Sequence, residues 1–532
     1  MRYDYTPSGR LRSMVYPDGT AVDYVRNAQG QTTEVGVTAP GGSRQRLLSG
    51  ATYYPFGPSA GWTYGNGRKL ARMYDQDYRP QSIQDTRTGG LEIGFGFDAV
   101  GDLTALTPAG NPTPELRLNY DALGRLTALK DGTTETVIDG YSYDGTGNRL
   151  SAKVGAATQA YTYPTTNHRL SAVAGVARTY DKMGNTLTIG GKAREYLYDT
   201  TGRMTQVKRA GTAVMNYRYN GRGEQVRRYL GTTNTYTLYD EAGHWLGDYD
   251  TNGAPKQQAI WLDDLPVGLL ANGGQLHYIE PDHLGSPRVV VDAARDVAVW
   301  SWSLKGEAFG NTAPNQDPDG DGAVMVFDMR FPGQRFDTAS GFNQNYFRDY
   351  DAATGRYGQS DPIGLNGGSS TYNYAFSSPF AATDFFGLKT YVIVTYDYGF
   401  GSHSAMFIDD SNGKQPFLYD PSGSYLSETR GSGGIFEGSS DGADLERYVK
   451  YQRGTGSTVK VIVLNTSSSQ EARFKDRAEE IGDPRGIFCA DSVSSVMSGY
   501  CSIRHTFIPG KLTEMVNEAK KRESSDSCPN EE

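Results

Sequence analysis

The chain has 532 residues, with 66 glycines, 37 tyrosines and a formal net charge of −9. This length exceeds what one hydrophobic core usually organises, so at least two domains are expected. The acidic balance argues against a nucleic-acid-binding protein, because such affinity comes largely from Lys and Arg contacts with phosphates. Three cysteines are too few for a disulfide framework. No apolar run approaches the roughly 18 residues of a membrane-spanning helix, and the N-terminus lacks the apolar segment of a signal peptide.

The first 260 residues repeat a short pattern in which an aromatic residue and Asp or Asn are followed, three residues later, by Gly. Asp and Gly are typical of the tight turn between two strands, and a Tyr ring can stack on its neighbours. One hairpin cannot bury its own face, so the copies are expected to stack into a larger sheet. Copies recur about every 18 to 23 residues, with a degraded copy after Tyr163, and start at Phe97, Tyr120, Tyr143, Tyr180, Tyr198, Tyr219 and Tyr239.

This motif and its period resemble YD repeats. In that family the repeats wind as a broad antiparallel β-sheet spiral that closes into a hollow shell. The resemblance implies a mainly β fold, with a YD-repeat shell over residues 1–260. The Asp and Tyr residues of this region are interpreted as turn and packing residues, and no catalysis is assigned to them.

Residues 261–388 carry a second set of motifs. Tyr278 to Arg288 reads YIEPDHLGSPR, and RFPGQ, NYFRDYD, GRY and DPIGL follow. Together they resemble the RHS-associated core of polymorphic toxins. In that family the core segment cuts the chain after a second D-P-x-G-L element, with the help of aspartates. The resemblance therefore implies self-cleavage at Leu388–Lys389, with the participation of Arg348, Asp349, Asp361 and Asp384.

The chemistry of such a cut is reasonable for two carboxyl groups. Two neighbouring carboxylates do not both ionise easily, so one stays protonated as an acid while the other activates a water. Arg348 would hold and orient the ionised partner. The sequence departs from the family pattern at Phe385, where Pro is usual. On the alternative interpretation these aspartates are only turn residues.

A short acidic stretch in the same region imitates a calcium-binding loop. Asp317, Asp319 and Asp321 alternate with Pro and Gly, and Asp328 takes the position where such a loop prefers Glu. No flanking helices are evident, so a polar turn is the favoured interpretation. Neither a metal nor a cofactor is predicted.

The composition changes at Lys389, and the last part of the chain predicts a small α+β domain over residues 389–532. The Gly/Ser-rich stretch 424–442 predicts a mobile loop. Strands are predicted at 392–395, 404–408, 416–419 and 459–464, and helices at 469–481, 489–497 and 511–522.

Two residues of this domain carry possible chemistry. His403 follows a Gly-rich turn at the start of a predicted strand, and Cys489 lies near the start of a predicted helix. A helix N-terminus and a nearby imidazolium both lower the pKa of a thiol, and a Cys–His pair is a nucleophile with its base. Asp420 ends the next predicted strand and could orient the imidazole, with Asp409 as the second candidate. The alternative is that both are structural, since a lone Cys is usually a small buried apolar residue.

The order His, Asp, Cys resembles circularly permuted papain-like hydrolases of the NlpC/P60 type. The strand GSHSAMFI, the helix start CADSV and the late PGKL match the elements of that family. The resemblance implies a cysteine-dependent hydrolase that cuts an amide, thioester or ester bond. The substrate would be a protein, a peptidoglycan peptide or an acyl lipid.

The predicted function is that of a secreted toxin, delivered into a target cell by contact-dependent or type VI-like export, whose shell encloses and releases a C-terminal hydrolase. The expected partners are an immunity protein, a secretion-apparatus spike, adaptor or chaperone, and the target-cell substrate; no nucleic acid is expected. Two alternatives stay open. One is a nuclease toxin using His403 and His505, and the other is a non-enzymatic cell-surface recognition module on a YD scaffold.

Overall fold

A computed structural model gives two compact units, Met1–Ser360 with Tyr372–Phe385, and Asp361–Thr371 with Phe386–Glu532. Each unit is described by itself. Up to residue 384 the structure describes all residues except 56–57, 77, 86, 99–100, 109–110, 305–307, 362–369 and 381–382. Beyond it, the structure describes residues 390–397, 400–408, 417–421, 425, 434–437, 443, 448–449, 451–452, 458–464, 468–481, 489–497, 503, 511–513, 515–517 and 519.

The first unit is built on one large antiparallel sheet, which has 29 strands within the described residues. Each strand pairs with the strand that follows it in sequence, so the sheet is a continuous meander. The strands are β1 (Arg2–Tyr5), β2 (Leu11–Val15), β3 (Ala21–Arg26), β4 (Thr32–Thr38), β5 (Arg44–Tyr53), β6 (Ser59–Tyr64), β7 (Lys69–Tyr74), β8 (Pro80–Gln84), β9 (Glu92–Phe97), β10 (Leu103–Thr107), β11 (Leu116–Tyr120), β12 (Leu126–Asp131), β13 (Val137–Tyr143), β14 (Arg149–Val154), β15 (Ala157–Thr162), β16 (Ala172–Val173), β17 (Val176–Tyr180), β18 (Thr186–Ile189), β19 (Arg194–Tyr198), β20 (Met204–Arg209), β21 (Thr212–Tyr219), β22 (Gln225–Leu230), β23 (Thr233–Tyr239), β24 (Trp245–Tyr249), β25 (Pro255–Leu262), β26 (Leu265–Ala271), β27 (Gln275–Pro281), β28 (Pro287–Asp292) and β29 (Val297–Ser301).

The repeated motif forms the turn between two strands, as its residues predict. In the copy at Tyr120, the Asp121 carboxylate accepts the backbone N–H groups of Leu123 and Arg125, and Gly124 adopts a φ of 73°. The Tyr120 hydroxyl donates to the Leu103 carbonyl at 2.8 Å, which ties each hairpin to the one before it. Copies at Tyr143 and Tyr219 repeat this backward contact. The motif is therefore both the turn and the stacking contact of the repeat.

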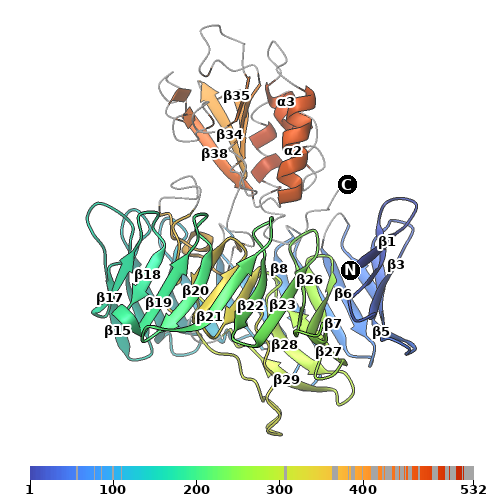
Figure 1. The fold of residues 1–532 in the computed structure, drawn as a ribbon. Helices are drawn as coiled ribbons and strands as arrows, with labels where there is room; N and C mark the ends of the chain where they lie inside the picture. The colour runs from blue at the N-terminus through green and yellow to red at the C-terminus, as the bar shows by residue number, and fades with distance from the viewer. Residues whose placement is uncertain are drawn as a thin grey trace. The chain divides into compact units, whose positions relative to one another are not determined.

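The sheet curves so that its first hairpins lie against strands β25–β28 (Figure 1). The Tyr16 hydroxyl donates to the Ala259 carbonyl at 2.7 Å, and the Tyr64 hydroxyl donates to the Ile279 carbonyl at 2.6 Å. Apolar residues from both ends of the sheet share one hydrophobic core. A single hairpin cannot bury its own apolar face, so this shared core stabilises the curved sheet as a whole.

A second, four-stranded sheet packs against the large one. It contains β30 (Gln334–Asp337), β31 (Phe342–Asn345), β32 (Arg348–Asp351) and β33 (Arg356–Tyr357). Buried polar contacts join the two sheets: Arg335 pairs with Asp248, and Arg178 pairs with Asp351 at 2.8 Å. Short 3-10 turns lie at η1 (Gly191–Ala193) and η3 (Ala375–Ser377). The core segment predicted from the sequence thus contributes its own sheet to the first unit.

The second unit has a five-stranded antiparallel sheet in the order β37-β36-β35-β34-β38. Met406 and Ile408 face α2 and α3, and Ala405 and Phe407 face the opposite side. This alternation is that of a strand buried on both faces. The elements are β34 (Thr390–Asp397), β35 (Phe400–Ile408), β36 (Phe417–Asp420), β37 (Gly434–Glu437), β38 (Thr458–Leu464), α2 (Ser468–Ile481) and α3 (Cys489–Val496) (Figure 1).

The prediction of a mobile loop over residues 424–442 is wrong in part. Strand β37 lies inside this stretch and pairs with β36, and the side chain of Tyr425 is buried. Ile435 and Phe436 supply the apolar side chains that make pairing favourable, and the surrounding Gly and Ser residues hid them in the composition. Among the described residues, no helix combines the length and apolar character that crossing a lipid bilayer requires.

Candidate functional site

Three side chains of the second sheet converge on Asp384, just before the predicted cleavage site. Arg348 donates to the Asp384 carboxylate at 3.0 Å, and the Tyr357 hydroxyl donates to the same oxygen at 2.9 Å. Asn345 donates from its amide to the Asp384 backbone carbonyl at 2.9 Å and to the Tyr357 oxygen at 2.6 Å. The Arg348 guanidinium also lies over the Tyr357 ring, 3.6 Å from its centre. All four residues are buried.

Asp349 forms a separate site on the other face of the same strand. Successive residues of a strand point to opposite faces, so Asp349 points away from the Arg348–Asp384 pair. Its carboxylate accepts a hydrogen bond from the Gln359 amide. Burial raises the pKa of Asp349 to about 7, with a further rise from Asp337, against the opposing effects of Gln359 and Arg203. Near neutral pH this carboxyl can therefore hold or release a proton.

The remaining predicted cleavage residues are placed only in part. Asp361 is buried, and its backbone N–H donates to the Thr371 carbonyl at 2.6 Å within the second unit. Phe385, Leu388 and Lys389 lie outside the described residues. The structure thus brings Arg348 and Asp384 together, and the cooperation of Asp349 with Asp361 stays a prediction.

In the second unit the structure brings His403 and Asp420 together. His403 Nε2 lies 2.6 Å from Asp420 Oδ1. Strand β35 pairs antiparallel with β36, with Tyr419 opposite Met406, so Asp420 lies one step further along, diagonal to His403. Asp420 is fully buried, whereas 15% of the His403 side chain is exposed. A buried carboxylate that contacts one ring nitrogen fixes the orientation of the imidazole and stabilises its charged form.

Two residues that the sequence did not single out complete this site. The Tyr448 hydroxyl donates to Asp420 Oδ1 at 2.6 Å, and Gln452 donates to the Tyr448 oxygen at 2.9 Å. The backbone N–H of Tyr425 also approaches Asp420, at 3.4 Å. The spacing of Tyr448 and Gln452 by four residues matches one helical turn, but nothing in the sequence connects that turn with Asp420.

The helix that begins at Cys489 packs on the opposite face of the sheet from His403. Ala490, Val493 and Val496 share a hydrophobic cluster with Met406, which alternates with His403 along β35. His403 instead shares its face with Ala405 and Phe407, which pack with Tyr448. The Cys489 side chain, Asp409 and His505 lie outside the described residues.

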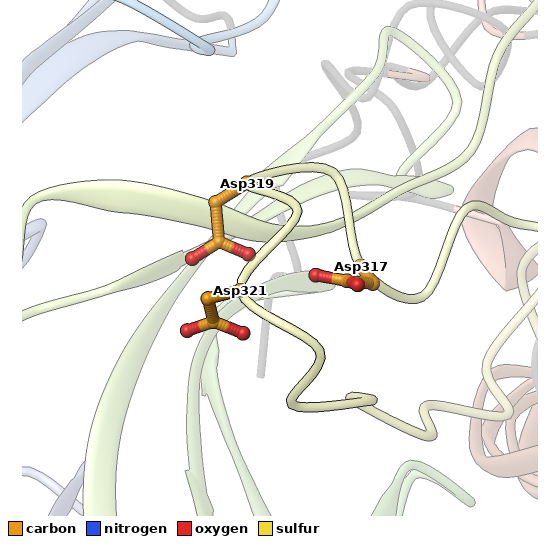
Figure 2. A group of neighbouring side chains, drawn as sticks. All are labelled: Asp317, Asp319 and Asp321. Carbon is orange, nitrogen blue, oxygen red and sulfur yellow. The ribbon is translucent and has the colours of Figure 1, made fainter.

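The acidic stretch of the first unit forms a compact group in which the carboxylates of Asp317, Asp319 and Asp321 converge (Figure 2). One oxygen from each residue lies within 4.8 Å of the others. Arg295 pairs with Asp319 at 2.9 Å and with Asp321 at 2.6 Å. The Arg295 guanidinium offsets part of the negative charge that a bound cation would otherwise offset. This contact favours the interpretation of the stretch as a polar turn over a metal site.

Comparison with known proteins shows that the first unit is similar to YD-shell proteins. A family described as the teneurin YD-shell matches residues 64–367. The crystal structure of TcdB2-TccC3 without its hypervariable C-terminal region superposes with a TM-score of 0.60 and 18% identity, covering 73% of this chain and 21% of that one. At this identity the likeness concerns the fold alone.

Two curated bacterial relatives are named as toxins. The double-stranded DNA deaminase toxin A of Burkholderia cenocepacia is 36% identical over 115 residues, and the toxin protein Tse5 of Pseudomonas aeruginosa is 33% identical over 120 residues. These matches cover 21% and 23% of this chain. In each case the chain spans only 8% of the relative's length.

Proposed function

Because this chain belongs to the teneurin YD-shell family, we propose that it is the shell-and-cargo part of a polymorphic toxin of the RHS type. Relatives that are named as toxins support this proposal. The observation that carries it is the His403–Asp420 contact of 2.6 Å, which gives the C-terminal unit an acid–base pair of its own. A shell that only recognised surfaces would not need such a pair.

The first step of the proposed function is release of the cargo by cleavage of the Leu388–Lys389 bond. The ionised carboxyl of the Asp349/Asp361 pair takes a proton from water, whose oxygen adds to the Leu388 carbonyl carbon. The protonated carboxyl gives its proton to the Lys389 nitrogen as the C–N bond breaks. The raised pKa of Asp349, about 7, suits the residue to the acid role.

The second step is hydrolysis by the released unit, with Cys489 as nucleophile. His403 would take the thiol proton, the thiolate would attack the carbonyl carbon of an amide, thioester or ester, and His403 would then protonate the leaving group. A water that gives its proton to His403 would next attack the acyl-thioester on Cys489, which releases the acid product and restores the thiol as the proton returns to the sulfur. Asp420 would orient the imidazole and stabilise its charged form. Cys489 is the first residue of α3, and this route requires its thiol to reach His403 although α3 packs on the opposite face of the sheet.

A second candidate function does without the thiol. The helix that starts at Cys489 packs on the face of the sheet opposite His403, which favours a His403–Asp420 base that activates water directly. A nuclease toxin using His403 and His505 is the form of this candidate that the sequence suggested. A surface-recognition module remains the non-enzymatic alternative.

Delivery and protection complete the proposal. A toxin must be harmless to its producer, so we expect an immunity protein that covers the exposed edge of His403. Export into a target cell would require a secretion-apparatus partner, as in type VI-like delivery. The substrate then lies in the target cell.

Growth of bacteria that express residues 389–532 tests the proposed function. Wild type should stop growth, and Cys489→Ser and His403→Ala should each abolish the effect while remaining folded by circular dichroism. Cys501→Ser is the matched control and should remain toxic. Toxicity that survives Cys489→Ser but not His403→Ala or His505→Ala would support the nuclease. Absence of toxicity in both cytoplasm and periplasm would support the recognition module.

A further inference from the structure

The contacts around Asp384 are more elaborate than a turn requires. Asn345 ends β31, Arg348 begins β32 and Tyr357 ends β33, so three strands each contribute one side chain. The Asp384 carboxylate receives two hydrogen bonds and its backbone carbonyl a third. Only 4% of Asp384 is exposed. These contacts therefore fix both the side chain and the backbone of Asp384.

We propose that Asn345, Arg348 and Tyr357 form a clamp that holds Asp384 as the recognition residue for self-cleavage four residues downstream. This inference rests on the proposed self-cleavage and adds to it two positioning residues, Asn345 and Tyr357. It also gives Arg348 a substrate-holding role in place of the orientation of a catalytic carboxylate.

The geometry explains how such a clamp would select one bond. An extended chain advances about 3.3–3.6 Å per residue, so the carbonyl of Leu388 can lie no further than roughly 14 Å from a fixed Asp384. Fixing one end of so short a segment raises the effective concentration of the scissile bond at the cleaving carboxyls. After the cut, the clamp would keep residues 384–388 on the first unit while the second unit departs.

The contacts of the clamp are of the kind that stay formed. The Arg348–Asp384 pair is a charge-assisted hydrogen bond inside a buried site, where such bonds are strong. Burial and the Asp384 charge raise the pKa of Tyr357 well above its ordinary value, so its hydroxyl remains a donor. Apolar side chains of the same volume are often at least as stabilising as a buried ion pair. We therefore explain the Arg348–Asp384 pair by the position that it fixes for Asp384.

The test is a time course of self-cleavage in the full chain, with the mass of the released fragment measured at each point. Asp384→Asn should slow cleavage about ten-fold or more and release fragments with more than one N-terminus. Tyr357→Phe should slow cleavage several-fold by removing one donor. Tyr350→Phe is the matched control, because it removes another buried hydroxyl of the same sheet, one that donates to the Phe309 carbonyl. It should cut like wild type.

The outcomes separate the clamp from the cleavage that it serves. If wild type is cut and both Asp384→Asn and Tyr357→Phe release the same single fragment at the same rate, the clamp is wrong and self-cleavage stands. If wild type itself is never cut, both fail. A loss of cleavage that Tyr350→Phe shares would mean that general destabilisation of the sheet is responsible, and would also overturn the clamp. A shift in the cut position is a result that destabilisation alone does not produce.

Discussion

Asp349 is a buried carboxyl group whose protonation links stability to pH. Burial raises its pKa from 3.8 to about 7, so the folded chain binds this proton more tightly than the unfolded chain. The contribution to stability is therefore fully present below about pH 4 and is lost as the pH rises through about 7. The ionised form is the one that burial penalises.

Replacing Asp349 by Asn should remove this penalty. Relative to its parent, Asp349→Asn is expected to gain stability between pH 5 and pH 8, by up to a few kcal/mol. Urea unfolding at the two pH values measures the gain, in an Asp361→Asn background so that neither chain is expected to cut itself. Asp121→Asn is the control, because the pKa of this turn carboxyl is lowered and the substitution should bring no such gain. If the difference in unfolding midpoint between Asp349→Asn and its parent is the same at pH 5 and at pH 8, the raised pKa of Asp349 is wrong.

Tyr448 gives a second prediction at the scale of single residues. Its hydroxyl donates to the buried Asp420, so Tyr448→Phe leaves that carboxylate with one donor fewer. A cost of about 1–3 kcal/mol in stability is expected, together with weakened but not abolished toxicity of residues 389–532. Thermal unfolding and growth curves measure the two effects. Tyr451→Phe, on the same helical turn, is the control; equal effects of the two variants would contradict a specific role for Tyr448.

The predictability of the site differs from residue to residue. The sequence suggested His403 with Asp420 because adjacent antiparallel strands bring their ends together, and the structure has this contact. It could not suggest Asn345, Tyr357 or Tyr448, because their partners lie far along the chain or on another turn. It also could not assign a face of the sheet to α3, since that choice depends on which apolar side of β35 the helix covers.

At the scale of elements, the two sheets of the first unit are joined by buried ion pairs. Asp248 of β24 accepts hydrogen bonds from both Arg335 of β30 and Arg228 of β22. Burial opposes the charge of Asp248, but Arg335 and Arg228 outweigh it and hold its pKa well below the ordinary value. This stability is present above about pH 4 and is lost as the pH falls towards the folded pKa.

Breaking this junction should destabilise the first unit. Asp248→Asn leaves two buried guanidinium groups without their charged partner, and a cost of about 3–5 kcal/mol is expected. Urea unfolding at pH 7 measures it. Asp250→Asn, in the exposed turn that follows β24, should cost far less. A similar small cost for both variants would show that the pair does not hold the sheets together.

The elements of the large sheet were predictable where the turn chemistry is complete. From Phe97 to Tyr239 each copy has Asp or Asn and a Gly, and each forms a hairpin. The first hairpins lack this exact pattern: in the turn after β1, the Thr6 hydroxyl takes the role of the Asp and accepts the Arg10 N–H at 3.1 Å. Gly9, with a φ of 79°, still closes the turn. The turn therefore requires a side chain that accepts a backbone hydrogen bond and a later residue with a positive φ. A search of the sequence for Tyr-Asp alone misses the turns in which another residue supplies the acceptor.

At the scale of the whole molecule, we propose that the YD-shell unit releases an enzymatic unit when the chain between them is cut. The two units have separate hydrophobic cores, as release of one from the other requires. The family membership is established for the first unit. Under the proposed function, the chemistry of the second unit would depend on His403 and Asp420, and its release would depend on the aspartates of the core segment.

The most direct measurement is the intact mass of the purified full chain, wild type beside Asp349→Asn. We predict that wild type separates under denaturing conditions into two pieces, residues 1–388 and 389–532, and that Asp349→Asn remains a single chain. A wild type that keeps the mass of all 532 residues, or an Asp349→Asn chain that is cut at the same bond at the same rate, would contradict aspartate-dependent self-release.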